Sequence, residues 1–498
     1  MGANNLKKIY ENMPRGIKFA FAPLFVRAMT GNPVFKKTWE SIDEFEQADS
    51  SKREQMQLNK LRCTLAYAYE NVPFYRRRFD EAGLDPYAIA GLKDIAKLPL
   101  LEKAEAIDAG DAMYSTDGSL DFYETFTGGS SGQALRVLLD KSSIYAERAF
   151  VCHFLSRFGY DPRKTRTVAL FGHNRDADYY YSPLKNEIVI SPFRLFDDSQ
   201  TEAVCHDIKS FGAEFLMGYP SAITQLARRV REHGIDLTFK RVVYYAENYS
   251  AEDKALAEET FRCPAVSYYG HTERAVFAEI TDGGCTFNDA YGYTELLPTG
   301  NPSEYRVVCT GFLSKKMPLI RYATDDHVVV GEDGNMRLVG HKRSDTYLVA
   351  RNGAHIFKGA MTLHVPELKS IVRYQYYQNE PGKAELRLMA SRPLSPTEES
   401  HLRGYLDRRC EGMIDVEISY VDSIELTARG KERWAIVEKN VTGGGCSQEH
   451  SPCEDVLDLR APEGSIDERR EEADGYRAAQ EDEPADARFA EEGGCSDD

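Results

Sequence analysis

The chain has 498 residues, of which 42% are hydrophobic, and a formal net charge of −17; this is too long for one compact core and sufficient for two or three domains. Residues 441–498 hold 18 Asp and Glu against five Arg and no Lys, so this segment carries 13 of the 17 net negative charges. We expect it to be a disordered acidic tail, because it has too little apolar content to offset its chain entropy. The rest of the chain is nearly neutral and has no basic stripe, which excludes an evident nucleic-acid surface.

The ten cysteines include no Cys-x-x-Cys pair and indicate no disulfide framework, so we expect a reducing, cytoplasmic location. Residues 19–26 form a short apolar run that is interrupted by Pro23 and closed by Arg27, whereas a membrane-spanning helix needs about 20 apolar residues. We therefore expect a docked amphipathic helix within a helical extension over residues 1–50, and no stable membrane insertion. A secretory signal and a helix resting on a membrane surface are the alternatives.

Helical and strand patterns follow one another along the body of the chain. Residues 50–83 are expected to be helical, because Leu58, Leu61 and Leu65 recur at helical spacing before Pro73 stops the run. Runs rich in β-formers then alternate with helical ones, which predicts a mainly parallel sheet covered by helices. The expected strands are 166–171, 187–190, 214–217, 241–245 and 265–268, and the expected helices are 201–211, 222–233 and 251–261.

The pattern changes in the second half of the chain. Residues 291–339 are dense in strands separated by polar turns, which predicts a smaller β-rich subdomain. A further unit follows, with a helix over 396–408 in which Pro396 suits the first turn. The expected fold class is therefore α/β, with a large N-terminal domain of mainly parallel, helix-covered sheets and the β-rich subdomain over 1–343, a small α+β domain over 344–440, and the acidic tail over 441–498.

The segment TGGSSG, from Thr127 to Gly132, combines three glycines with three hydroxyls. Glycine permits close backbone approach and the hydroxyls add donors, so the segment suits a loop that wraps phosphate oxygens, and equally an ordinary tight turn. It is not a Walker loop, since no Gly-Lys-Ser or Gly-Lys-Thr follows, and the glycine spacing does not match the dinucleotide fingerprint. The segment alone leaves both alternatives open.

Four further motifs follow in order: YGHTE at 269–273, MPLIRYATDD at 317–326, GHKRSD at 340–345 and GK at 430–431. With the glycine loop, this series resembles the adenylate-forming superfamily of acyl-CoA synthetases. The phenylacetate:CoA ligase branch and its capsular-polysaccharide-biosynthesis relatives are the most similar, because MPLIRY and the upstream segments VPFYRRRFDEAG and LPLLEK have counterparts there. The resemblance covers residues 50–440.

The resemblance implies that the motifs bind ATP. The glycine loop would hold the β- and γ-phosphates, although Gln133 and Ala134 replace the Lys and Pro that are common in the family, and Arg136 is the alternative source of positive charge. Asp326 matches the carboxylate that accepts both ribose hydroxyls, and Asp325, where Gly is common, faces either the ribose or solvent. The implied nucleotide-binding residues are Thr127, Gly128, Gly129, Ser130, Ser131, Gly132, Glu247 on the adenine-side loop, Tyr269 and Gly270 beside adenine, Asp326, and Arg343 before the hinge.

The resemblance also implies a catalytic set. Its members are Lys431, Thr272, Glu273 and His271. Thr272 would contact the α-phosphate, and Lys431 would bind the substrate carboxylate and the α-phosphate, supplying positive charge where the transition state gathers negative charge. The small C-terminal domain would be mobile and would rotate about Asp345 between the two steps of the reaction.

Two metal sites follow from the same resemblance. Glu273 would hold Mg²⁺, which prefers a carboxylate together with phosphate oxygens; the alternative is an ordinary surface pair between Glu273 and Arg274. Some relatives hold a structural metal after the Tyr-Gly motif, and the candidates here are His271 with Cys263, Cys285 and Cys309. Their spacing forms no recognisable ligand set, which favours buried free thiols.

The function implied is ATP- and Mg²⁺-dependent activation of a small-molecule carboxylic acid to an acyl-adenylate with release of pyrophosphate. The acyl group would then pass to CoA as co-substrate or to an amine, as in surface-polysaccharide biosynthesis. The acid pocket is expected from residues 145–150 and 171–181, the segment from Gly218, and residues just before Tyr269. One alternative is a catalytically degenerate nucleotide- or acyl-binding protein, favoured by the departures in the glycine loop and at Asp325. Another is an adenylyltransferase that leaves AMP on its product. No nucleic-acid partner is expected, and the oligomeric state is not predicted.

Replacing Lys431 with Ala is expected to slow acyl-adenylate formation by about 10²- to 10³-fold, the usual scale for losing one charge-stabilising donor. Acyl transfer from preformed adenylate should be largely unaffected, because the lysine is assigned to the first step alone. Pyrophosphate exchange and single-turnover transfer measure the two half-reactions separately. Equal damage to both would contradict the assignment.

Overall fold

The computed structural model describes residues 22–127, 135–171, 179–195, 198–246, 249, 251–339, 347–353, 355–356, 361, 363, 368, 370–410, 412–425, 434–438 and 441. Several predicted site residues lie outside the described residues: Gly128, Gly129, Ser130, Ser131, Gly132, Glu247, Arg343, Asp345 and Lys431. Residues 442–498, which include almost all of the acidic tail, lie outside them as well.

Four helices form the beginning of the described chain: α3 (Ala22–Gly31), α4 (Pro33–Gln47), α5 (Ser50–Asn71) and α6 (Pro73–Ala82). Asn32 and Asp49 cap α4 and α5 by accepting hydrogen bonds from backbone N–H groups of the first turns. The helix expected over 50–83 is two helices, because Pro73 ends α5 and then occupies the first turn of α6, where its missing N–H costs nothing. Within the described residues, no helix combines the length and apolar character that a membrane crossing requires.

An eight-stranded sheet forms the centre of the fold, with strand order β10-β9-β8-β7-β6-β3-β5-β4. The run β8-β7-β6-β3-β5 is parallel, and the strands outside it pair antiparallel. The strands are β3 (Thr167–Leu170), β4 (Tyr180–Ser182), β5 (Glu187–Ile190), β6 (Phe215–Gly218), β7 (Arg241–Tyr244), β8 (Ala265–Gly270), β9 (Phe277–Thr281) and β10 (Gly284–Phe287). The predicted mainly parallel sheet is confirmed, and each of the five predicted strands is present.

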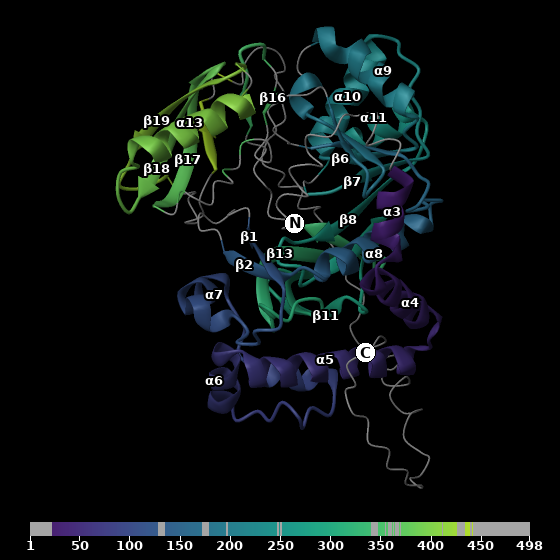
Figure 1. Cartoon of the computed structure of the whole chain (residues 1–498), viewed down its shortest axis with the longest axis vertical. Coiled ribbons are helices and arrows are strands. Elements are labelled where there is room, and N and C mark those ends of the chain that lie inside the picture. Colours follow the sequence, from purple (N-terminus) through teal and green to yellow (C-terminus); the bar gives the residue numbers. More distant parts are fainter. Residues whose placement is uncertain are drawn as a thin grey trace, which may run out of the picture. The chain divides into compact units, whose positions relative to one another are not determined.

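Helices cover both faces of this sheet. Alternate residues such as Leu170, Leu216 and Val242 pack beneath α9 (Thr201–Phe211), α10 (Pro220–Glu232) and α11 (Ala251–Phe261), which Figure 1 shows gathered on one side. Residues of the other face, such as Met217 and Val243, pack against α8 (Ser143–Ser156). The three helices between strands agree with the predicted positions. The strands are apolar on both faces, as expected of a buried parallel sheet.

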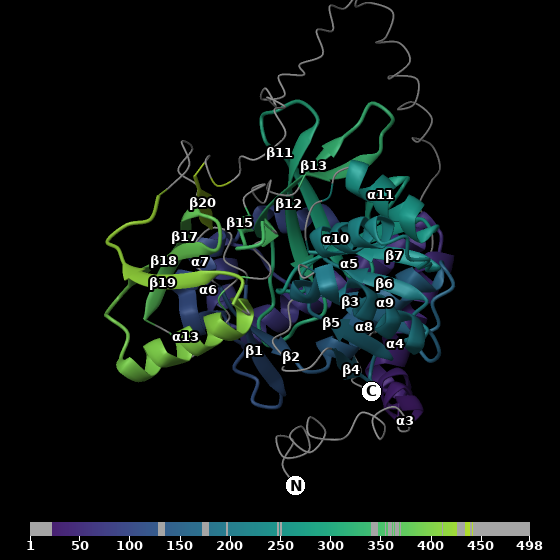
Figure 2. The same cartoon turned by 90° about the horizontal axis from the view of Figure 1, so that it is seen from above.

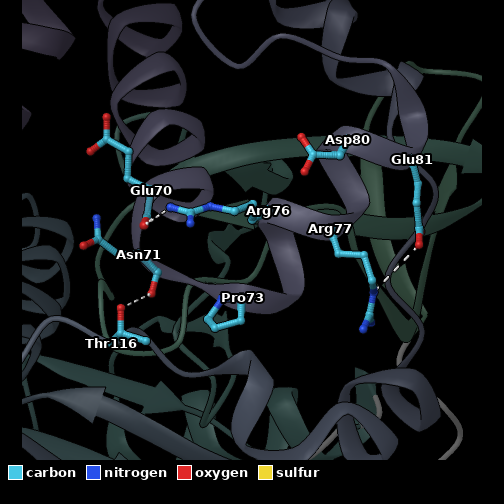
Figure 3. Close-up of a pocket in the computed structure, with 8 residues that line it drawn as sticks. All are labelled: Glu70, Asn71, Pro73, Arg76, Arg77, Asp80, Glu81 and Thr116. Carbon is cyan, nitrogen blue, oxygen red and sulfur yellow. Dashed lines mark hydrogen bonds and ion pairs between the residues drawn. The ribbon is translucent and has the colours of Figure 1, made fainter.

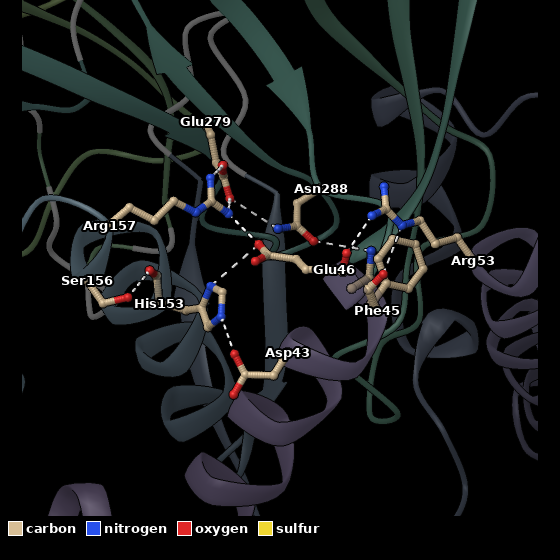
Figure 4. Close-up of polar contacts among 10 residues, drawn as sticks. Asp43, Phe45, Glu46, Arg53, His153, Ser156, Arg157, Glu279 and Asn288 are labelled. Atoms are coloured by element: carbon tan, nitrogen blue, oxygen red, sulfur yellow. Dashed lines mark hydrogen bonds and ion pairs between the residues drawn. The ribbon is translucent and has the colours of Figure 1, made fainter. Parts of the chain in front are cut away.

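A polar network joins α4 to α8 and the sheet (Figure 4). His153 of α8 lies 2.9 Å from the carboxylate of Asp43 and 3.7 Å from that of Glu46, both on α4. Arg157, at the end of α8, contacts Glu46 and also Glu279 of β9. Because one arginine bridges carboxylates from two elements, the network fixes the N-terminal helices on the central sheet.

A second, antiparallel sheet contains β11 (Gly292–Pro298), β12 (Glu304–Gly311), β13 (Tyr322–Val330) and β14 (Met336–Val339), in that order. This is the predicted β-rich subdomain. Helix α5 lies beside β11, and the hairpin β1 (Phe122–Phe126) and β2 (Arg136–Asp140) adds to the same apolar core. The short helices on this side are η1 (Leu92–Lys97), α7 (Lys103–Ala109) and η2 (Gly110–Met113); η3 (Pro192–Leu195) and η4 (Asp198–Gln200) accompany α9.

The C-terminal part has its own sheet, of order β19-β18-β17-β20, and its own apolar core, which includes Leu386, Leu402 and Trp434. Helix α13 packs along β19 in Figure 2. Its elements are β15 (Leu348–Val349), β16 (His355–Ile356), β17 (Ile371–Glu380), β18 (Lys383–Ala390), α13 (Pro396–Cys410), β19 (Asp415–Tyr420) and β20 (Ala435–Val437). This is the α+β composition that was expected, whereas the domain boundary at residue 343 stays a prediction.

The buried side chain of Arg321 ties three segments together. Its Nε and Nη2 donate to the carboxylate of Glu295 on β11 at 2.9 and 2.8 Å. Its Nη1 donates to the carbonyls of Ala96, at 3.0 Å, and Leu98. The side chains of Arg321 and Glu295 are only 8% and 11% exposed. The start of β13 is therefore fixed against both η1 and β11.

Replacing Arg321 with Met should destabilise the protein by about 3 to 5 kcal/mol, because Glu295 would be left as a buried, unpaired charge. Urea unfolding measures the loss. Arg136→Met is the matched control, since Arg136 also pairs with a glutamate, Glu124, but both side chains are at least 40% exposed and such pairs contribute little. Similar losses in the two variants would contradict the role given to Arg321.

Candidate active site

Strands β8 and β13 bring two of the sequence motifs together. Tyr269 and Gly270 are the last residues of β8, at the carboxyl edge of the parallel strands, and His271 follows them. Asp326 lies in the middle of β13. The two motifs, which are far apart in the sequence, therefore meet at one edge of the central sheet.

The side chains of Tyr269, His271 and Asp326 form one hydrogen-bonded cluster. Tyr269 Oη donates to Asp326 Oδ2 at 2.9 Å, and His271 Nε2 lies 3.1 Å from the same oxygen. The Tyr269 and His271 rings meet edge to face with centroids 4.7 Å apart, and their polar atoms also share a hydrogen bond. Burial, and then the charge of Asp326, hold the pKa of Tyr269 well above its usual range. The phenol consequently stays protonated and donates to the carboxylate.

Local backbone contacts fix the carboxylate within its strand. Thr324 Oγ1 donates to the carbonyl of Val307 at 2.7 Å and accepts from the backbone N–H of Asp326 at 3.2 Å. The side chain of Asp326 is 26% exposed, which leaves it accessible at the edge of the cluster. Its neighbour Asp325 is exposed, which agrees with the solvated alternative for this residue.

Glu273 lies near the cluster but belongs to a separate contact. Tyr322 Oη donates to Glu273 Oε1 at 3.2 Å. Arg274 instead donates to Ser143 Oγ at 2.7 Å and lies over the ring of Tyr123. Among the described residues, Glu273 and Arg274 form no ion pair, so the surface-pair alternative is not seen here. A partly buried carboxylate is a suitable ligand for Mg²⁺ with phosphate oxygens, and that role stays a prediction.

Two further predicted residues, Thr272 and Thr127, are among the described ones. Thr272 is exposed. Thr127, at the base of the glycine loop, is buried, and its Oγ1 accepts from the backbone N–H of Leu135 at 2.9 Å. This contact closes the two ends of the loop, whereas the phosphate contact expected of Thr127 stays a prediction.

Backbone strain accompanies the motifs. Ala246, Arg274 and Arg321 have φ angles of 66°, 51° and 49°, in the left-handed region that residues with a Cβ seldom adopt. Ala246 directly precedes Glu247, and Arg274 directly follows Glu273. Such strain clusters at functional sites because the surrounding contacts must enforce it. No local pattern indicated this strain, since none of the three residues is glycine or asparagine.

A partly buried carboxylate, Glu147 of α8, is a neighbour of the cluster that the sequence did not single out. A Cβ added at Gly270 would lie 4.0 Å from Glu147 Oε1, and Tyr291 Oη donates to Glu147 Oε2. Burial raises the pKa of Glu147, while the charge of Arg274 opposes the rise. Its segment was expected near the acid, but the packing of its carboxylate against Gly270 depends on the tertiary fold.

A cavity of about 200 Å³ is lined by Tyr268, which directly precedes Tyr269, and by residues that follow the carboxyl ends of β3, β6 and β7. Its lining residues are Arg148, Phe171, Lys185, Glu187, Met217, Tyr219, Tyr245 and Tyr268. The segments predicted to form the acid pocket supply Arg148, Phe171, Tyr219 and Tyr268. They meet around one cavity, and its use for the acid stays a prediction.

A larger hollow of about 420 Å³ lies at the junction of α5 and α6 (Figure 3). Its charged side chains satisfy one another or the backbone: Arg76 donates to the carbonyls of Tyr69 and Glu70, and Arg77 pairs with Glu81. None of the predicted site residues lines it. We therefore place the candidate site at the sheet edge.

The cysteines considered for a structural metal are buried in the fold. Burial raises the pKa of the Cys263 thiol to about 11 and that of Cys285 to about 12, and holds the pKa of Cys309 well above its usual range. Within the described ranges, no group of three or more His, Cys, Asp or Glu side chains is arranged to hold a metal.

No protein-family model matches the chain. The phenylacetate-coenzyme A ligase of Pseudomonas putida is 26% identical over 367 residues, covering 68% of this chain and 82% of the relative. That of Escherichia coli strain K12 is 25% identical over 371 residues, with the same coverage. Protein CapK of Staphylococcus aureus is 22% identical over 391 residues, covering 74% of this chain and 86% of the relative. The solved 2-hydroxyisobutyryl-CoA ligase with 2-HIB-AMP and CoA has a TM-score of 0.49 at 17% identity, covering 78% of this chain and 90% of that one.

These relatives confirm the resemblance that the ordered motifs predicted. The chain is similar to phenylacetate-coenzyme A ligases and to CapK.

Replacing Glu147 with Gln should change how stability depends on pH. The pKa of Glu147 is raised above its ordinary value of 4.5 in the fold. The folded state therefore holds this proton more tightly than the unfolded chain does. Its contribution to stability is fully present below pH 4.5 and is lost as the pH rises through the folded pKa.

The variant avoids that loss, so its unfolding free energy relative to the parent should increase as the pH rises from 4.5 towards neutrality. Urea unfolding across that range is the measurement. Glu81→Gln, at an exposed carboxylate, is the control for removing a carboxylate at the surface. A pH dependence for Glu147→Gln no steeper than that for Glu81→Gln would contradict the burial argument.

Proposed function

We propose that the protein uses ATP to convert a carboxylic acid into an acyl-adenylate, releasing pyrophosphate, and then passes the acyl group to CoA or to an amine. One observation carries the proposal: two consecutive residues of β8 contact two different parts of the site. Tyr268 lines the cavity, whereas Tyr269 contacts Asp326. Neighbouring side chains of a strand point to opposite faces, so a nucleotide bound at Asp326 and an acid bound in the cavity would reach each other past the carboxyl end of β8, where the strand stops at Gly270.

The chain's own residues supply the chemistry of the first step. Asp326, oriented by Tyr269 and His271, would accept the ribose hydroxyls as an ionised carboxylate. Glu273 would hold Mg²⁺, which offsets the phosphate charge when bound. Thr272 would contact the α-phosphate. Holding both reactants in one geometry removes much of the entropic barrier to attack on phosphorus.

The loop from Thr127 to Gly132, with Glu247, Arg343 and Lys431, completes the proposal through the family resemblance alone. The loop would hold the β- and γ-phosphates, and Lys431 would bring positive charge to the reacting carboxylate. The small C-terminal domain would then rotate for acyl transfer. The names of the phenylacetate-coenzyme A ligase relatives favour CoA as the acceptor. An amine acceptor and a role in surface-polysaccharide biosynthesis rest on the sequence resemblance.

The central experiment is acid-dependent exchange of labelled pyrophosphate into ATP across a panel of carboxylic acids, with analysis of the nucleotide product after acceptor addition. Exchange followed by release of AMP supports the proposal. ATP binding without exchange for any acid would favour the degenerate binding protein, and AMP retained on the product would favour the adenylyltransferase.

Replacing Asp326 with Asn should weaken ATP binding by about tenfold or more, because charge-assisted hydrogen bonds contribute roughly 1.5 to 3 kcal/mol each and about 1.4 kcal/mol is one decade. The parent should also prefer ATP to 2′-deoxy-ATP, and the variant should lose most of that preference. Titration calorimetry with both nucleotides measures the effect.

Asp325→Asn is the matched control for this experiment, since Asp325 is adjacent and exposed and should change binding little. If Asp326→Asn discriminates the two nucleotides as well as the parent does, Asp326 is not the ribose ligand.

A further inference from the structure

The cavity that Tyr268 lines lies at the point of the parallel sheet where the order of the strands reverses. Strands β3 and β6 are neighbours, but the chain goes from β3 towards β5 on one side and from β6 to β7 on the other. The connections diverge at this point, and open α/β sheets bind ligands in the crevice so formed. Phe171, Tyr219 and Tyr245 each directly follow one of these strands, and all three line the cavity.

The wall of the cavity is aromatic. The Tyr245 and Tyr268 rings are stacked with centroids 5.9 Å apart, and Tyr219 meets Tyr245 edge to face at 5.9 Å. Phe171 meets Tyr245 at 6.3 Å. Such a wall suits the apolar body of a small extended or aryl acid.

Charged groups enter this apolar layer from two elements. The face of the sheet beneath α8 is otherwise lined by residues such as Phe215, Val243 and Val266. Glu187, on β5, is only 4% exposed, and Arg148 reaches the cavity from α8. Burying such charges costs free energy unless partners compensate for the lost hydration. Their presence at the wall of a cavity therefore calls for a specific reason.

The positive charges at the cavity are only partly neutralised by partners within the protein. Arg148 Nη2 donates to Tyr160 Oη at 2.5 Å, and this is its one hydrogen bond among the described residues. Lys185 Nζ lies 3.8 Å from Glu187 Oε1, and its side chain is 44% exposed. Arg148 and Glu187 form no direct ion pair within the described chain. Two cations and one carboxylate give the cavity a net charge of about +1, with donors of the guanidinium remaining for a ligand.

We propose that the acid carries a second oxyanion, a carboxylate at the far end of its tail, and that Arg148 binds it with Lys185 at the rim of the cavity. This inference rests on the proposed function and names its substrate class as a short dicarboxylic acid. The reacting carboxylate must reach the nucleotide side, which Tyr269 and Asp326 mark, so Arg148 serves the opposite end. A guanidinium is the donor that matches a carboxylate in a bidentate way.

Two sets of acids test directly whether the far end of the substrate carries a second carboxylate. The linear set is glutarate, its uncharged isostere 5-methylhexanoate, and 5-aminopentanoate. The aryl set is 4-carboxyphenylacetate, 4-isopropylphenylacetate and 4-(aminomethyl)phenylacetate. In at least one set, kcat/KM for pyrophosphate exchange should be about tenfold or more higher for the dicarboxylate than for its isostere, and lowest for the ammonium member. Preference for the isostere or the ammonium member in both sets overturns the proposal.

Variants then assign the preference to the cavity. Arg148→Met should reduce the dicarboxylate preference by about tenfold while changing kcat/KM for the isostere much less. Lys185→Met, at an exposed side chain, should reduce the dicarboxylate preference by a smaller factor. This variant provides the test if Arg148→Met fails to fold. Glu187→Gln should increase the preference. The control is Arg166→Met, because Arg166 lies over the ring of Phe211 as Arg148 lies over the ring of Tyr160, and Arg166 does not line the cavity. An unchanged preference in both Arg148→Met and Lys185→Met overturns the proposal.

Direct binding separates this inference from the proposed function. Titration calorimetry measures the same acids on the full chain without exchange. If no acid supports exchange but the dicarboxylate binds about tenfold tighter than its isostere and Arg148→Met removes the difference, the proposed reaction fails and the cavity assignment stands. The opposite outcome is exchange with acids whose far end is uncharged, while neither assay shows a preference for the dicarboxylate. In that case the proposed reaction stands and the cavity assignment is wrong.

Discussion

The geometry of the site depends on one buried charge, the guanidinium of Arg321. Its side chain joins Glu295 of β11 to the carbonyls of Ala96 and Leu98, the latter 223 residues away in the sequence. These contacts hold the Arg321 backbone in a left-handed conformation that costs on the order of 1 to 3 kcal/mol. The cost is offset because the arginine and its glutamate satisfy each other in a largely buried setting. Asp326 lies in β13, the strand that begins directly after Arg321, so its position opposite β8 follows from this contact.

The central sheet would divide the proposed chemistry between its two faces. Tyr268 and Tyr269 are consecutive, yet one lines the cavity and the other contacts Asp326, because side chains alternate along a strand. The close approach of β3 and β6 at the crevice also requires a particular residue. A Cβ on Gly218 would lie 2.6 Å from the carbonyl oxygen of Leu170, so only glycine lets the chain turn there. The same strand geometry that forms the cavity therefore places the nucleotide motif beside it.

The sequence predicted the regular part of this arrangement and missed the part that depends on distant contacts. Strands and helices of the central sheet were predicted because periodicity and turn residues are local signals. The sequence indicated that Pro73 ends a helix, but it did not indicate that a second helix, α6, begins at the same proline. The family resemblance assigned Tyr269 and Asp326 to one nucleotide site, and their side chains are in contact in the structure. The buried contacts of Arg321 and the packing of Glu147 against Gly270 could not, because no local pattern encodes contacts across strands.

Helix α8 shows why such contacts matter for function. Glu147 and Arg148 are consecutive charges in a helix whose neighbouring inner residues, Ala146 and Ala149, are buried and apolar. Consecutive helical residues point about 100° apart, so one charge lies beside Gly270 of the motif and the other enters the cavity. A stable core would place apolar side chains at both positions, since partly buried charges weaken folding. Departures from the local rules of folding concentrate where a protein acts on its ligands. A single turn of helix thus supplies a charge to each side of the point where acid and nucleotide would meet.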